Sequence, residues 1–211
     1  MSIIDTTNVI IGNSPTQSQN LKITGNGDGT FTFSRADGSQ TIMTVDGSGN
    51  INAPVSILQT GIAMPRMVLS TAQATTSGTS IDFTGIPSWV KRITVMFNGV
   101  SCASGSDQLI QIGSGSIDAT GYLSCSEAVA YTTGFGIRNT IPAWTIKGLM
   151  ILVHMGNNIW CMSQNLYMDA GTTVRNAGGT KTLSGPLDRV RLTNTLGDTF
   201  DAGSVNIMYE G

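Results

Sequence analysis

The sequence predicts an all-β protein made of antiparallel strands, and three observations lead to this prediction. Apolar and polar residues alternate over short segments, turn-forming residues separate these segments, and no segment has the apolar period of a helix. Glycine is abundant, at 26 of 211 residues. Charged residues make up only 11% of the chain, against about 25% in an average globular domain. The straight-chain residues that favour exposed helices are therefore scarce, which excludes a coiled coil or helical bundle.

Residues 1–62 are predicted to form a small β-meander. Apolar pairs at a spacing of two residues are separated by turns rich in Gly, Asn and Asp, which tolerate positive φ. So few large side chains cannot close a core, and modules of this size usually need a metal, disulfides or oligomerisation. We therefore expect a homotrimer, because three-fold wrapping is an economical way to bury a meander. The expected interface residues are Leu21, Ile23, Phe31, Phe33, Met43, Val45 and Ile51.

A break in the strand pattern places the domain boundary near residue 62, where Pro54, Gly61 and Pro65 interrupt any continuous ladder. Residues 63–211 carry longer alternating segments, about eight in number, which predict an antiparallel β-sandwich or jelly-roll-like head.

The segment 149–155 differs from the other strands because it is apolar on both faces. Such a strand lies in the middle of a layered fold or at a subunit interface. From this segment we predict that Met150, Leu152 and His154 also belong to the trimer interface.

Residues needed for catalysis or metal binding are scarce. His154 is the only histidine, and Glu127 and Glu210 are the only glutamates, so a histidine site or a pair of glycosidase carboxylates has little to draw on. Motifs for nucleotide binding, zinc proteolysis and a nucleophile elbow are absent. The run Asp46 to Ile51 begins like a calcium loop but lacks its glycine, and is predicted to be a hairpin turn. We expect no enzymatic activity, no metal and no cofactor.

Charge and targeting patterns restrict the partners. The formal net charge is −2 and the basic residues are scattered, so no nucleic-acid partner is expected. The N-terminus lacks a secretory signal pattern, and the longest apolar run is too short to cross a bilayer. Cys102, Cys125 and Cys161 are predicted to be small buried residues of a protein made in a reducing cytosol, with a disulfide or metal site as the alternative.

Aromatic side chains near turns are the candidate ligand contacts. Trp and Tyr join a large apolar body to a polar group, so they stack on sugars or anchor protein contacts. Trp144, in a turn-rich segment, is the clearest loop-borne example, whereas Trp160 alternates with core residues and is assigned to packing. The alternative is that the candidate rings also belong to the core. The candidates are Trp89, Tyr122, Tyr131, Trp144 and Tyr167.

Two parts of the chain resemble a known family. Residues 79–95, TSIDFTGIPSWVKRITV, and residues 197–210, GDTFDAGSVNIMYE, resemble the C-terminal head of tail-fibre and receptor-binding proteins of tailed bacteriophages and prophages. Residues 30–51 resemble the short β-repeats of phage fibre shafts and adaptors. The resemblance implies a homotrimer whose N-terminal part docks on other tail or baseplate proteins of the virion and whose β-sandwich tip touches the host.

The expected function is therefore a structural virion protein, a tail fibre or tip, that is made in the host cytoplasm and recognises the host surface. The receptor is expected to be a bacterial surface glycan or an outer-membrane receptor, bound by three weak sites whose multivalency raises the avidity. The alternative is a connector or decoration protein of the baseplate, tail or head fibre, for which a large exposed apolar patch is expected. A depolymerase is a third hypothesis.

Overall fold

The chain divides into two compact units, Met1–Met64 and Pro65–Gly211. The predicted boundary at residue 62 lies two residues before this division. All described secondary structure is β, and no described helix is long and apolar enough to span a membrane. The computed structural model describes residues 8–11, 15–16, 20–38, 40–49, 51–52, 58–59, 62–63, 66–139, 141–169 and 173–211.

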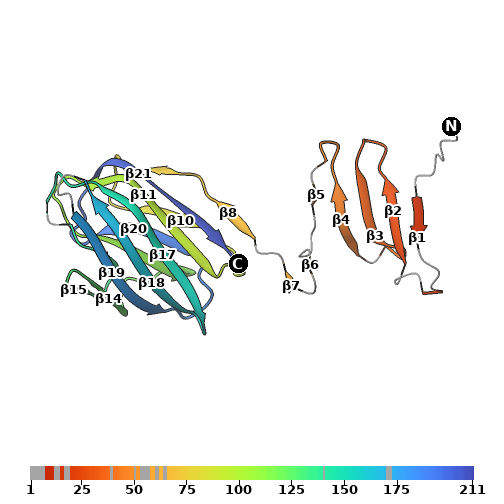
Figure 1. Cartoon of the computed structure of the whole chain (residues 1–211). Helices are drawn as coiled ribbons and strands as arrows, with labels where there is room; N and C mark the ends of the chain where they lie inside the picture. Colours follow the sequence, from red (N-terminus) through yellow and green to blue (C-terminus); the bar gives the residue numbers. More distant parts are fainter. Residues whose placement is uncertain are drawn as a thin grey trace. The chain divides into compact units, whose positions relative to one another are not determined.

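The N-terminal unit is an antiparallel meander of five strands in sequential order (Figure 1). Each strand pairs with the next one along the chain. A separate two-stranded hairpin follows the meander. The meander strands are β1 (Asn8–Ile11), β2 (Leu21–Gly25), β3 (Phe31–Arg35), β4 (Thr41–Val45) and β5 (Ile51–Asn52), and the hairpin strands are β6 (Leu58–Gln59) and β7 (Ile62–Ala63).

The turn between β4 and β5 shows why Asp and Gly are placed where they are. The Ser48 and Gly49 backbone N–H groups donate to the side-chain and main-chain oxygens of Asp46, each at 2.9 Å. Gly49 has a φ of +84°, a conformation open to glycine. The predicted hairpin turn at this position is therefore confirmed, because Val45 and Ile51 pair directly across it.

The C-terminal unit contains a nine-stranded and a five-stranded antiparallel sheet (Figure 1). The larger sheet follows the order β15-β14-β19-β18-β17-β11-β21-β8, with β9 also on β21. Its strands are β8 (Met67–Leu69), β9 (Gln73–Ala74), β11 (Arg92–Cys102), β14 (Tyr122–Ser126), β15 (Val129–Tyr131), β17 (Ile146–Gly156), β18 (Ile159–Met168), β19 (Thr173–Thr182) and β21 (Phe200–Glu210). The smaller sheet contains β10 (Ile81–Thr84), β12 (Gln108–Ser114), β13 (Ser116–Ile117), β16 (Phe135–Ile137) and β20 (Arg189–Asn194).

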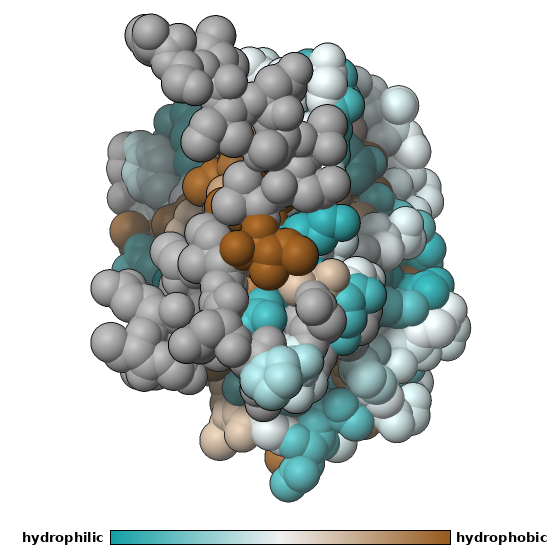
Figure 2. Space-filling view, turned by 90° about the vertical axis from the view of Figure 1, so that its right-hand side faces the viewer, coloured by the Kyte–Doolittle hydropathy of each residue, from teal (hydrophilic) through white to brown (hydrophobic). Residues whose placement is uncertain are grey.

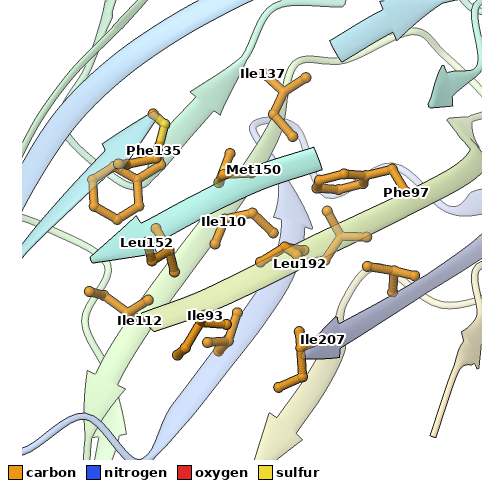
Figure 3. Packing of buried hydrophobic residues seen from close by; sticks show 14 of the residues in the cluster. Ile93, Phe97, Ile110, Ile112, Phe135, Ile137, Met150, Leu152, Leu192 and Ile207 are labelled. Carbon is orange, nitrogen blue, oxygen red and sulfur yellow. The ribbon is translucent and has the colours of Figure 1, made fainter. Parts of the chain in front are cut away.

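The hydrophobic core is formed by side chains from both sheets of this unit. Ile93, Val95 and Phe97 alternate along β11 and are all buried, since successive side chains of a strand point to opposite faces. They pack with Ile110 of β12 and Leu192 of β20 in the smaller sheet (Figure 3). The predicted all-β fold with antiparallel sheets is thus present, and two sheets sharing one core are consistent with the predicted sandwich.

Candidate interaction surfaces

All of the predicted interface residues of the N-terminal unit lie on one face of its sheet. Ile23 pairs with Phe33, and Phe33 pairs with Met43, so these three side chains share a face. Phe31 and Val45 follow by the two-residue period of a strand, and Val45 pairs with Ile51. We call this set the apolar N-terminal face: Leu21, Ile23, Phe31, Phe33, Met43, Val45 and Ile51.

The opposite face of this sheet is polar apart from Ile10 and Ile42. Thr24 pairs with Thr32, and Thr32 pairs with Thr44, so hydroxyls line its middle. None of the apolar side chains described in residues 10–52 is buried, and Phe31 and Ile51 are exposed. A sheet with one apolar and one polar face normally covers the apolar one. The described residues of this unit supply no second layer for that purpose.

Met150 and Leu152 do not lie at a subunit interface, which corrects the prediction. Both side chains are fully buried in the core of a single chain (Figure 3). Their neighbours Leu149 and Val153 point from the other face of β17 and are 47% and 42% exposed. The segment is apolar on both faces as predicted, but the inward face packs on the chain's own smaller sheet. The face available to a partner therefore contains the odd-numbered residues.

These exposed side chains continue across the outer face of the larger sheet. Leu69, Met208, Thr94 and Ile151 lie in direct register on four neighbouring strands, β8, β21, β11 and β17. Met96 pairs with Leu149 in the adjacent row. We call this set the outer patch, and it contains Leu69, Met96, Leu149, Ile151, Val153, Met155 and Met208.

Apolar exposure is not spread evenly over the molecule. In the view of Figure 2 most of the coloured surface is hydrophilic or neutral, and apolar side chains appear in separate areas.

Next to the outer patch, Arg92 and Glu210 form an ion pair of 3.0 Å. Lys147 and Asp169 form another pair on the same sheet. The flanking charges are thus neutralised in pairs, which leaves the patch itself uncharged.

Tyr122 and Tyr131 are core residues and cannot stack on a ligand, which corrects two of the aromatic predictions. Tyr122 is 1% exposed and its hydroxyl accepts a hydrogen bond from the Ile112 N–H at 2.7 Å. Tyr131 is 6% exposed, and its ring lies directly on Gly136, where a Cβ would come within 2.1 Å of the ring.

The face of strand β14 that carries Tyr122 is buried. Its other residues are polar, although buried strand faces are usually apolar. Ser124 and Ser126 face inward, where their hydroxyls accept hydrogen bonds from the backbone N–H groups of Gly136 and Arg138. Leu123 faces outward and is 74% exposed. Leu123 and Cys125 lie in a shallow, mostly apolar groove of about 290 Å³ whose other lining residues are Tyr122, Ser124, Ala130, Tyr131, Thr132 and Gly178.

The other predicted aromatics keep part of their surface free but do not form one site. Trp89 is half-buried, lies 5.9 Å from Tyr209 between ring centroids, and has the Arg66 guanidinium 5.6 Å from its own centroid. Trp144 is half-buried against the core under Arg175. The two residues flank opposite ends of the β11–β17 pair. Tyr167 is exposed on the outer face of β18.

His154 shares the inward side of β17 with Met150 and Leu152 but lies at the end of the sandwich, where it is half-buried. It stacks against Trp160 with 5.2 Å between ring centroids. Desolvation, and then the charge of Lys91, lower the pKa of His154 below its usual value. Here a pocket of about 90 Å³ is lined by Ser88, Val90, Lys91, His154, Asn158, Trp160, Pro186 and Leu187.

Searches against protein-family models, curated proteins and solved structures found no match. Within the described part of the chain, no group of three His, Cys, Asp or Glu side chains is arranged to hold a metal ion. The three cysteines are free, and they differ in environment, since Cys102 is buried and Cys125 is exposed.

Neither the outer patch nor the pocket beside His154 is predicted from the sequence. The signal for the patch was present, because residues 149–155 are apolar at both odd and even positions. The pocket had no such signal, because it joins residues from three separate segments near positions 90, 156 and 186.

Proposed function

We propose that this chain is a structural protein of a tailed-bacteriophage virion, a tail fibre or tip with a jelly-roll-like head, that acts as a homotrimer in host recognition. The observation that carries the proposal is the apolar N-terminal face. A small sheet with one apolar face suits a fibre protein, because such a module is stable only when identical modules pack around it.

The size of the apolar N-terminal face supports self-association. Full burial of a Val, Leu, Ile or Phe side chain contributes about 1.5–3 kcal/mol, and half-buried side chains gain about half of that. Burial of Phe31, Phe33, Ile51 and their neighbours in each of three chains is comparable with the cost of association, about 4–15 kcal/mol. The polar Thr-rich face then remains in water.

Host recognition is assigned to the C-terminal unit. Tyr167 is the predicted aromatic with the most accessible surface, and Trp144 is partly accessible beside Arg175. Aromatic rings with a nearby polar group suit the alternating apolar and polar surface of a bacterial glycan. Weak contacts repeated three times in a trimer reach useful avidity.

Other virion proteins are the expected partners of the N-terminal unit.

The alternative function is a connector or decoration protein of the virion, and the outer patch is the observation that favours it. Leu149, Ile151, Val153 and Met155 present an uncharged apolar surface suited to another protein. In the receptor-binding protein this surface is covered by a neighbouring subunit, whereas in a connector it is covered by a different virion protein.

Binding to whole host cells tests the proposal. The expected result is that the wild-type protein binds and that Tyr167→Ala binds more weakly at unchanged thermal stability. Trp144→Ala is also expected to bind more weakly, with some loss of stability because its ring packs against the core. Leu123→Ala is the matched control, because Leu123 is exposed on the same sheet but lies outside the proposed contact. Immuno-electron microscopy that places the protein at an internal junction of the virion, together with absence of cell binding, supports the connector instead.

A further inference from the structure

The pocket beside His154 is shaped by a tight turn at the end of the sandwich. Asn157 and Asn158 join β17 to β18 with φ values of +51° and +57°, the conformation of a two-residue hairpin turn that asparagine tolerates. The Asn158 carbonyl accepts a hydrogen bond from the Leu183 N–H at 3.0 Å. The turn is therefore held against the loop that supplies Pro186 and Leu187 to the same pocket.

Backbone hydrogen bonds also fix the position of Lys91. Its carbonyl accepts from the His154 N–H, and its own N–H donates to the Glu210 carbonyl, both at 2.8 Å. The backbone of Lys91 therefore lies beside β17, and the Nζ atom of its side chain lies 3.5 Å from Nδ1 of His154. Two nitrogens that both carry or can carry positive charge are thus held side by side.

Neither nitrogen has an acidic partner among the described residues. No Asp or Glu lines the pocket. On the neighbouring strand β11, Arg92 lies on the other sheet face and pairs with Glu210, and in the adjoining loop Asp188 pairs with Arg189. Seven of the other lysines and arginines in residues 66–211 pair with a carboxylate, and Arg66 lies over Trp89. Lys91 is therefore a positive charge without a carboxylate partner among the described residues, and it lies beside an imidazole that can also donate a hydrogen bond.

We propose that this pocket binds the carboxylate of an acidic saccharide, with Lys91 and His154 donating to its oxygens. The volume of about 90 Å³ is larger than a single water molecule needs, so the pocket admits a carboxylate. Ser88 and Asn158 also line the pocket and offer further hydrogen-bonding groups. A charge-assisted hydrogen bond from the Lys91 ammonium to a carboxylate is stronger than one between neutral groups.

The assignment of the carboxylate to a saccharide rests on the proposed function. The binding of a carboxylate in this pocket does not depend on that function. Titration of the full chain with sodium glucuronate separates the two, with glucose as the neutral control and inorganic phosphate as the alternative anion. His154 is the only histidine, so its imidazole resonances report on this pocket without ambiguity. Calorimetry measures the affinity independently of the histidine signal.

Glucuronate is expected to shift the His154 resonances and to raise the pKa of that imidazole, because the bound negative charge offsets Lys91. Glucose is expected to leave both unchanged. Lys91→Gln is expected to weaken glucuronate binding about tenfold, whereas Lys147→Gln, which removes a lysine paired with Asp169, retains wild-type affinity. Circular dichroism and thermal unfolding establish that both variants fold.

Two results overturn the inference: no response of His154 to glucuronate, or phosphate binding more tightly than glucuronate. Glucuronate binding that survives Lys91→Gln also contradicts it. If glucuronate binds as expected while the wild-type protein fails to bind host cells, the pocket assignment stands and the proposed function fails.

Discussion

Tyr131 donates a hydrogen bond to Asp107, with 2.7 Å between its hydroxyl and Oδ2. The same carboxylate accepts from the Arg138 guanidinium and from the Asn139 N–H, both at 2.8 Å. Strand β15 is thereby tied to the segment that enters β12 and to the end of β16. Burial and the adjacent negative charge raise the pKa of the Tyr131 hydroxyl well above its usual value.

Tyr131→Phe is expected to lower the free energy of unfolding by about 1 kcal/mol, because one hydrogen bond to a charged group is lost while Arg138 and Asn139 still satisfy the carboxylate. The raised pKa means that the folded state holds this proton more tightly than the unfolded state. The stability that this proton contributes is therefore complete below about pH 10 and is lost as the pH rises further. Urea unfolding at pH 8 and pH 10.5 measures both effects, and Tyr167→Phe, at an exposed tyrosine, is the control.

Phe33→Ser is expected to abolish or greatly weaken self-association, because Phe33 lies in the middle of the apolar N-terminal face between Ile23 and Met43. Thr32→Ser changes the neighbouring residue on the opposite face and keeps its hydroxyl. Light scattering over a range of protein concentrations compares the two variants. Equal molar masses for Phe33→Ser and Thr32→Ser contradict the assignment of the interface to this face.

Gly203→Ala is expected to destabilise the C-terminal unit by about 3 kcal/mol, through overpacking and a strained backbone. At this bulge between β11 and β21 a Cβ would lie 2.3 Å from the Gly99 carbonyl oxygen, and the φ of Gly203 is +87°. Gly197 has a similar φ of +72° with nothing within 4 Å of its Cβ position, so Gly197→Ala is expected to cost about 1 kcal/mol. Similar unfolding midpoints for the two variants would refute the close approach.

The single histidine gives a prediction for pH dependence. Because the pKa of His154 is lowered in the folded protein, the unfolded state binds this proton more readily. The stability is therefore highest above pH 6.5 and falls as the pH drops below that value. His154→Gln is expected to flatten the unfolding free energy between about pH 5 and pH 7, where other side chains titrate little. A wild-type protein that is more stable at pH 5.5 than at pH 7.5 contradicts the direction.

Local sequence features predict the strands and turns well because they act over a few residues. The Gly and Asp of the β4–β5 turn and the alternation of Ile23, Phe31 and Phe33 specify the meander and its apolar face. The same rule assigns the core residues Ile93, Val95 and Phe97 to one side of β11.

Sequence patterns do not predict which side chains are buried where the environment of a strand face depends on segments far away in the chain. In β14 the serines point inward because they bind the backbone of β16, which alternation cannot foresee. In β17 both faces are apolar, so nothing local indicates that Met150, rather than Leu149, meets the smaller sheet. The burial of Tyr131 likewise depends on its packing on Gly136 and its bond to Asp107.

The molar mass of the wild-type chain tests the central claim most directly, because the apolar N-terminal face is assigned to contact identical chains. One chain has a mass of 22.1 kDa. Light scattering coupled to gel filtration is expected to give about three times that value, and to keep it on dilution to micromolar concentration. A stable monomer of 22.1 kDa that remains folded and soluble would contradict the trimer and, with it, the proposed role of the N-terminal face.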